Sequence, residues 1–574
     1  MRMPKLDRGL QEGPALMVVL GAVVGLPAGA VAVLLRGGVQ QIVVALEPLR
    51  GHAWGVLLPA VGAMAGVWIV RALFREPSGH GVPAVIEAVA GRGGAMRRRS
   101  VFSRLLGSMV NVASGGSAGL EGPIVFSAAA VGSAIGGQLR LAERQRVILL
   151  ACGVAGGIGA IFDAPLTGLI FASEVVLMEW SLSTVLPVAV SAIVATELGR
   201  RLLGAEGPLL HGSFEYGTVD LAACALLGVL AGLVSVAVVR AIHRTETAVR
   251  RFKGRGLAGN PFTVSALAGL GVGLIGYALP AAIGEGYGTV DGAVDGSLAG
   301  GLGMLALLLA GKLAATALTL GSGAPGGIFA PSLVLGALLG ASFGHLLETV
   351  APGAGFAEPR AFALVAMAGL VAGTMQAPLT GLFLVLETTR GWDLALPLML
   401  VATISVLVSR SLQRHSFYTH GLALSGKLLR PLSDQRLLTD LQVGEMLDAE
   451  SAQIEAGQTL EDLVLLLPTT RRNHFAVIDP ESGALEGMLD VSALRPFIFD
   501  QALRRATPVE TVMDAGVASI DYDADLVEAM ELFESSGAWV LPVVRAGRYV
   551  GTVSKSTLFD RYRQEHAVQA AERE

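Results

Sequence analysis

The 574-residue sequence is poor in charged residues, aromatic residues and cysteine. Charged types make up 16% of the chain, whereas a soluble globular domain is usually about one-quarter charged. Aromatic types make up 5%, and the formal net charge of -5 provides no general basic surface for nucleic acid. The two cysteines, Cys152 and Cys224, both lie in apolar stretches and suit neither a disulfide framework nor a metal site. These shortages argue against a wholly soluble enzyme, a fibrous protein and a disordered chain.

Apolar residues and glycine are what the sequence has in excess. Hydrophobic types make up 52% of the chain and glycine supplies 75 positions, well above its ordinary share of about 7%. Apolar stretches recur from about Leu16 to Leu412, the first of them long enough for a retained membrane helix, and Gly or Pro interrupts many. In lipid, an unpaired backbone is tolerated only where protein buries it or water reaches it. The pattern therefore predicts an all-α polytopic membrane domain with broken and re-entrant helices.

The composition changes near Arg430, where charge density becomes normal and short alternating strands begin, such as Phe475–Ile478 and Trp539–Val544. This change predicts a small soluble α/β domain of roughly 140 residues, which is an ordinary domain size. Strongly basic stretches include Arg97–Arg99 and Arg240–Arg255. By the positive-inside rule these face the cytoplasm, together with both chain ends.

The membrane region contains an internal repeat. Phe162–Gly168, followed by Glu174, recurs 213 residues later as Met375–Gly381, followed by Glu387. The repeat predicts two related halves, and transporters commonly place their substrate between such halves.

Three glycine-rich loops each precede an apolar helix: Gly79–Pro83, Gly119–Pro123 and Gly321–Pro331. The second has the shape G-x-E-x-P, and the end of the third, 208 residues on, has the shape G-x-F-x-P. A helix start presents free N–H groups and about +0.5 of an elementary charge. Three such starts that converge inside a membrane would bind an anion without a full positive charge. The alternative is close helix packing through small residues.

Glu121 is the most informative single residue, because a carboxylate in an apolar segment is costly unless it is paired or functional. Beside an anion site it could occupy that site when ionised and leave it when protonated, acting as both a gate and a proton carrier. The alternative is a carboxylate that only caps its own helix.

With these motifs, the chain resembles the CLC family of chloride channels and chloride/proton antiporters over roughly residues 15–425. The resemblance implies two inverted repeats, a homodimer with one pore per subunit, chloride-like anions and possible protons as substrates, and the plasma membrane of a prokaryote. It also implies that Glu121 is the gating glutamate. The anion-binding residues that it implies are His80, Gly81, Gly122, Ile328, Phe329 and Tyr418.

Two departures from the family pattern affect the expected mechanism. His80 stands where the family has a serine, and we hypothesise that a bound anion favours its protonated form; the alternative is a neutral histidine without a titrating role. Val175 stands where many antiporters have a proton-carrying glutamate, so a passive channel and a chloride/proton antiporter both remain open. Glu174 and Glu387 are interpreted as structural carboxylates.

The soluble domain contains a second repeat, in which Val443–Ile454 matches Val509–Ile520 at a spacing of 66. This repeat resembles a pair of cystathionine-β-synthase-type (CBS) domains, which often bind adenine nucleotides. The ribose-binding aspartate of that pattern is replaced by Ala493 and Thr557, although Asp490 lies near the first position. We therefore expect no cofactor, and a dimer-stabilising or regulatory module with weak or no nucleotide binding.

The chain is thus expected to be a transporter or channel rather than an enzyme. One alternative is an intramembrane hydrolase, because Gly115–Gly119 fits the G-x-S-x-G pattern with Ser117 as nucleophile, but the strand-turn-helix context of that motif is missing. The expected segments are a transmembrane domain at 1–425, a linker at 426–442, a first CBS domain at 443–505, and a second CBS domain with the C-terminal tail at 506–574.

Overall fold

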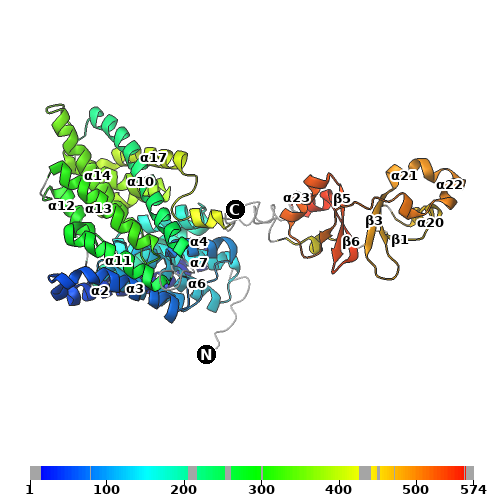
Figure 1. Cartoon of the computed structure of the whole chain (residues 1–574), viewed down its shortest axis with the longest axis horizontal. Coiled ribbons are helices and arrows are strands. Elements are labelled where there is room, and N and C mark those ends of the chain that lie inside the picture. Colours follow the sequence, from blue (N-terminus) through cyan, green and yellow to red (C-terminus); the bar gives the residue numbers. More distant parts are fainter. Residues whose placement is uncertain are drawn as a thin grey trace. The chain divides into compact units, whose positions relative to one another are not determined.

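The structure is a computed structural model that describes residues 14–77, 79–204, 216–252, 260–298, 301–425, 441–448, 453–470, 472–561 and 563. The chain divides into two compact units, Met1–Leu428 and Leu429–Glu574, each of which is described by itself (Figure 1). Most of the predicted linker at 426–442 lies outside the described residues, as do positions 253–255 of the second basic stretch.

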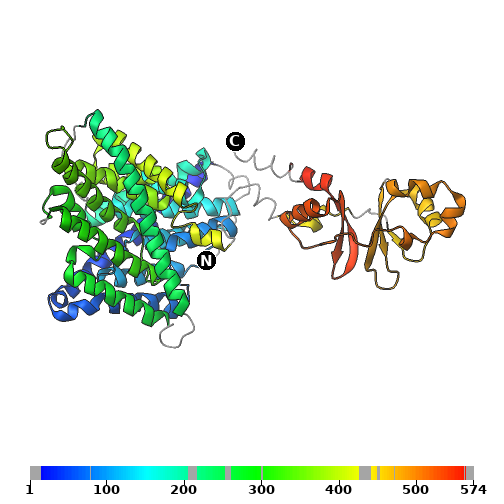
Figure 2. The ribbon, with the colours of Figure 1, turned by 45° about the horizontal axis from the view of Figure 1, so that its top comes forward.

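The described part of the first unit is helical, with helices that differ in length and cross at varied angles (Figures 1 and 2). Its helices, with short 3-10 and π segments marked η, are α2 (Pro14–Arg50), η1 (Ala53–Leu57), α3 (Leu58–Trp68), η2 (Ile69–Leu73), α4 (Gly81–Gly91), α5 (Ser100–Ala113), α6 (Glu121–Gln138), α7 (Glu143–Phe162), α8 (Pro165–Phe171), η3 (Ala172–Leu177), α9 (Leu182–Leu203), α10 (Thr218–Phe252), α11 (Pro261–Ala278), η5 (Pro280–Ala282), α12 (Tyr287–Asp295), α13 (Gly301–Gly321), α14 (Phe329–Val350), α15 (Pro359–Met375), α16 (Pro378–Thr389), η6 (Trp392–Leu394), α17 (Ala395–Leu412) and α18 (His420–Leu424).

Nine helices within the described ranges are long and apolar enough to cross a membrane. Four shorter apolar helices lie among them, and two of these, α4 and α16, are 11 and 12 residues long. A helix rises about 1.5 Å per residue, so neither of these two can span a hydrocarbon core of about 30 Å. The predicted class, a helical membrane domain with broken helices, is confirmed.

The sequence repeat of the first unit is also a structural repeat. Helices α7 and α15 each end in a left-handed residue, Asp163 and Gln376, both with a φ of 56°. In each case an alanine follows, and a proline, Pro165 or Pro378, begins the next helix. Proline suits the first helical position and disfavours helical backbone in the residue before it. The same chemistry therefore breaks the helix at the same place in both halves.

Two glutamates join the halves reciprocally. Glu387 accepts hydrogen bonds from the amide and the hydroxyl of Thr167, both at 2.6 Å, at the start of α8. Glu174 accepts the equivalent bonds from Thr380 at the start of α16, at 2.8 and 2.7 Å. Each carboxylate thus caps a helix of the other half and places its negative charge at that helix's positive end.

In the residues that the structure describes, the second unit contains two three-stranded sheets of identical topology, in which the first strand is parallel and the third antiparallel to the middle strand. Val443 at its start packs in the core of the second sheet, whereas Val509 packs in the core of the first. The first segment of each sequence repeat therefore packs in the core that belongs to the sheet of the other repeat. The elements are η7 (Val443–Met446), β1 (Gln453–Glu455), α20 (Leu460–Leu466), η8 (Leu467–Thr469), β2 (His474–Ile478), β3 (Leu485–Asp490), α21 (Val491–Ile498), α22 (Gln501–Ala506), η9 (Val509–Thr511), β4 (Ile520–Asp521), α23 (Leu526–Ser536), β5 (Val540–Arg545) and β6 (Arg548–Ser554).

Candidate anion site

The three glycine-rich loops meet at one place in the first unit. Gly81, the first residue of α4, lies so close to the carbonyl oxygen of Gly122 that a Cβ there would collide with it. Gly122 in turn faces Gly326: a Cβ added to Gly122 would lie 3.1 Å from the carbonyl oxygen of Gly326. Gly119 and Gly327 form a two-residue antiparallel bridge with two N–H···O bonds of 2.9 Å. The starts of α4, α6 and α14 therefore converge, as the sequence predicted, and they do so through glycine because a side chain would hold them apart.

The Glu121 side chain occupies this convergence point and is 1% exposed. One carboxylate oxygen, Oε1, accepts the backbone N–H of Phe329, the first residue of α14. The other, Oε2, is buried and has no hydrogen-bond partner among the described residues. The carboxylate lies over Gly119 and Gly327, where a Cβ on either would collide with it. A carboxyl group therefore sits where free helix-start N–H groups would hold an anion.

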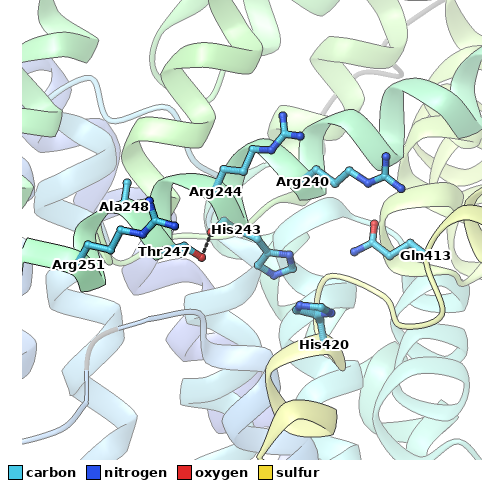
Figure 3. Close-up of a pocket in the computed structure, with 8 residues that line it drawn as sticks. All are labelled: Arg240, His243, Arg244, Thr247, Ala248, Arg251, Gln413 and His420. Carbon is cyan, nitrogen blue, oxygen red and sulfur yellow. Dashed lines mark hydrogen bonds between the residues drawn. The ribbon is translucent and has the colours of Figure 1, made fainter.

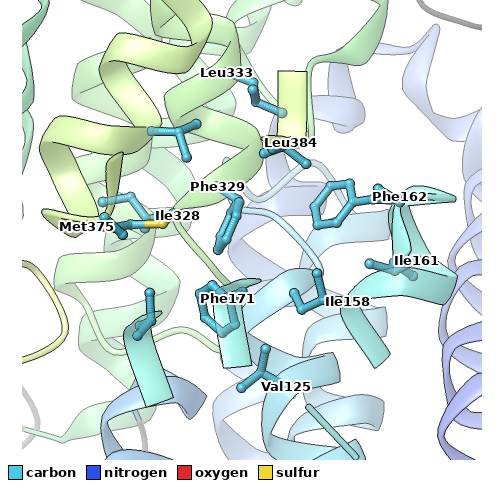
Figure 4. Close-up of a cluster of buried hydrophobic side chains, with 14 of the residues drawn as sticks. Val125, Ile158, Ile161, Phe162, Phe171, Ile328, Phe329, Leu333, Met375 and Leu384 are labelled. Atoms are coloured by element: carbon cyan, nitrogen blue, oxygen red, sulfur yellow. The ribbon is translucent and has the colours of Figure 1, made fainter. Parts of the chain in front are cut away.

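Aromatic side chains wall the site. The Phe329 ring packs between Phe162 at 5.8 Å and Phe171 at 5.4 Å between centroids (Figure 4). Tyr418 packs edge-on against Phe171 at 6.5 Å, and its hydroxyl is buried without a hydrogen-bond partner within the described ranges. Ile328 is the fully buried residue that precedes α14. A buried hydroxyl normally finds a partner, so that of Tyr418 is suited to donate to a bound anion.

His80 is the residue just before α4, and its ring packs 4.5 Å from that of Phe417. Both ring nitrogens are buried without a hydrogen bond to the described residues. The closest acid is Glu246 of α10, whose Oε1 lies 3.5 Å from Nε2 of His80, beyond good hydrogen-bond distance. Arg104 donates to carbonyl oxygens of the loop before His80 and fixes its course.

A basic pocket of about 500 Å³ lies beside α10 (Figure 3). Two residues that line it, His243 and His420, have stacked rings whose centroids are 4.4 Å apart. Its lining consists of Arg240, His243, Arg244, Thr247, Ala248, Arg251, Gln413 and His420. The arginines of this lining are expected to concentrate anions near the C-terminal end of α10.

Other candidate residues lie outside the anion site. Val175 is buried in η3, directly after the helix-capping Glu174. The Ser117 hydroxyl is 3.0 Å from that of Thr316. In the second unit, the Asp490 carboxylate accepts the N–H of Ser492 and caps α21. Among the described residues, no group of three or more His, Cys, Asp and Glu is placed to hold a metal ion.

Sequence reasoning missed Glu246 and Arg104. Glu246 lies inside the basic stretch that began at Arg240 and was interpreted only as a topology signal. Glu246 is a lone acid among six basic residues and lies three positions after His243. Because residues three apart share a helix face, this spacing is the signal that could have drawn attention to it.

The comparisons with known proteins give a consistent result. The family model for the voltage gated chloride channel matches residues 61–410, and that for the CBS domain matches residues 509–563. The H(+)/Cl(-) exchange transporter ClcA of Salmonella typhimurium is 30% identical over 423 residues, which is 71% of this chain and 89% of that protein.

Two further comparisons extend over different parts of the chain. The chloride channel protein CLC-f of Arabidopsis thaliana is 26% identical and covers 93% of this chain and 78% of its own length. The crystal structure of a slow cyanobacterial Cl-/H+ antiporter superposes with a TM-score of 0.62 at 24% identity, covering 71% of this chain and 97% of that one.

Proposed function

This chain belongs to the CLC family of voltage-gated chloride channels, and from that premise we propose that it carries chloride across a membrane through its first unit, with Glu121 as the gate. The predicted family is confirmed by the match over more than half of the chain, and the fold class by the antiporter structure. The chain is an integral membrane anion transporter or channel and not an enzyme, and the hydrolase alternative is unsupported.

The single observation that carries the proposed mechanism is the carboxylate of Glu121 on the N–H of Phe329. This N–H belongs to a helix start, where the helix dipole favours negative charge. An ionised carboxylate and a chloride ion therefore compete for the same place. Protonation removes the charge of Glu121, weakens its hold on the N–H, and lets chloride enter.

We favour chloride/proton exchange over a passive channel, because a glutamate that binds and releases one proton in each anion displacement couples the two movements. The exchange activity named for the Salmonella relative supports this choice. The second candidate is a channel, and Val175 favours it, because valine cannot carry a proton at a position where many antiporters have glutamate.

Proteoliposomes that hold the purified full-length protein test the two candidates. We impose a chloride gradient without a proton gradient and record chloride and pH together. Uphill proton movement identifies exchange, whereas chloride flux without proton movement identifies a channel. Glu121→Gln is expected to stop proton movement while chloride continues to flow. Glu197→Gln is the matched control, because Glu197 pairs with Arg201 on α9 and is 51% exposed.

The assembly and orientation belong to the same proposal. Two copies associate, each with its own pore, in the plasma membrane of a prokaryote, with both termini in the cytoplasm. The basic stretch Arg97–Arg99 supports this orientation. Light scattering of the purified protein measures the number of associated copies. Cysteine labelling near each terminus in intact cells measures the orientation.

The second unit acts as a regulatory or dimer-stabilising module. Weak or no nucleotide binding is supported by Ala493 and Thr557 at the aspartate positions, and by Asp490, whose carboxylate already caps a helix. Calorimetry of the full-length protein with ATP and AMP is expected to detect no micromolar binding.

A further inference from the structure

A pair of titratable side chains connects the water-exposed surface of α10 with the start of α4. The Glu246 side chain is 29% exposed and meets water, whereas that of His80 is 9% exposed. Their facing atoms, Oε1 and Nε2, are 3.5 Å apart. The residue after His80 packs on Gly122, which directly follows Glu121. Exposure therefore falls from Glu246 to His80, and His80 lies next to the residue that packs against the loop of the gating carboxylate.

The surroundings of this pair are predominantly basic. On α10 itself, His243 and Arg250 act electrostatically on Glu246. From the segment after α17, His420 stacks on His243, and Phe417 covers the His80 ring. The Arg250 guanidinium favours the ionised form of this carboxylate, which is the form that can accept a proton from water.

The chemistry of the two groups differs from that of a static ion pair. Both nitrogens of His80 are buried without a hydrogen bond to the described residues, although buried polar atoms are normally satisfied. Imidazole can accept a proton at one nitrogen and release one from the other.

We propose that Glu246 is the proton-loading residue on the α10 side of the transporter and that His80 relays its proton toward Glu121; this inference rests on the proposed exchange function. The Glu246 carboxylate takes a proton from water and becomes neutral. It then passes the proton to Nε2 of His80, which restores the carboxylate and forms an imidazolium. The imidazolium donates its Nδ1 proton to a water molecule on the side toward Glu121 and returns to neutral imidazole. The pair thereby supplies the proton transfer that Val175 cannot perform.

The test records proton and chloride flux together from the full-length protein in proteoliposomes. In Glu246→Gln we expect the ratio of protons to chloride ions to fall by about tenfold or more, while chloride flux stays measurable. His80→Gln is expected to lower the same ratio, since glutamine cannot take up a proton. Glu246→Asp keeps a carboxylate and is expected to restore part of the ratio, and Glu197→Gln is expected to keep the ratio of the unmodified protein.

The possible outcomes separate this inference from the proposed function. If the unmodified protein exchanges and Glu246→Gln keeps its ratio, proton loading by Glu246 is refuted and exchange stands. If the unmodified protein moves chloride without protons, proton loading is refuted and chloride transport stands as a channel. If it moves no chloride, both are refuted. Should Glu246→Gln fail to fold, an unchanged ratio in His80→Gln refutes the relay by itself.

Discussion

Removal of the Glu174 side chain should destabilise the first unit without changing the ratio of protons to chloride. Glu174 accepts hydrogen bonds from the amides of Leu379 and Thr380, at 3.2 and 2.8 Å, and from the Thr380 hydroxyl at 2.7 Å. These donors belong to the first turn of α16, in the other half of the unit. In Glu174→Ala all three lose their acceptor.

The expected magnitude follows from the burial of these donors. Thr380 is fully buried, and each buried donor left without an acceptor costs about 1–3 kcal/mol. Leu379 is partly exposed, so water can serve its amide. Because Thr380 contributes two such donors, we expect Glu174→Ala to lower the free energy of unfolding by about 2–6 kcal/mol, and Glu174→Gln, which keeps one acceptor oxygen, by about half of that.

Denaturant unfolding of the purified protein in detergent measures this change. Glu387→Ala should have a similar effect, because Glu387 holds Leu166 and Thr167 at 2.9 and 2.6 Å in the same way. The control is Glu197→Ala, which breaks an exposed ion pair worth at most about 0.5 kcal/mol.

Two results would refute the reasoning. One is a loss below about 0.5 kcal/mol for Glu174→Ala, within the range of an exposed ion pair. The other is Glu174→Gln that keeps its stability but loses proton coupling, because Glu174 would then carry protons rather than cap a helix.

Three further predictions concern the site and the second unit. Tyr418→Phe removes a hydroxyl without a partner among the described residues, so chloride transport should persist with affinity weakened by about tenfold, measured by isothermal titration calorimetry. Gly327→Ala places a Cβ against the carboxylate of Glu121, so chloride flux should lose its dependence on pH, measured in a pH series on proteoliposomes. The N–H and hydroxyl of Thr459 donate to Asp462 and hold the pKa of that carboxyl below its usual range. The ionised Asp462 therefore stabilises α20 at neutral pH. This stabilisation is lost as pH falls below about 3.9 and through the lowered pKa. Asp462→Asn should therefore lower the melting temperature of the second unit at pH 7, and the difference should shrink in acid.

Much of the membrane architecture could be predicted because it depends on short-range chemistry. Proline favours the first turn of a helix and disfavours helical backbone just before it, so the repeated Ala-Pro-Leu-Thr-Gly motif predicted the same helix break in two related halves. The sequence G-x-E-x-P likewise predicted Glu121 at a helix start, where the structure places it. The anion-binding roles of His80 and Tyr418 stay predictions until affinities are measured.

Long-range pairing could not be predicted, because it depends on how the halves pack. The repeat identified Glu174 and Glu387 as equivalent residues, but not that each would cap a helix of the opposite half. The tail repeat did not predict that its first segments would be exchanged, because the same residue type, valine, stands at positions 443 and 509 and gives no local signal of which core each one joins.

The sequence by itself determined the membrane setting, the repeat and the helix starts that favour an anion, because hydropathy, helix breaking and helix dipoles are properties of contiguous residues. Only the tertiary structure decided which charges meet. The approach of Glu246 to His80, 166 positions earlier, arises from the packing of α10 near the α4 loop. No local pattern encodes that contact, because burial and distance exist only once the chain has folded.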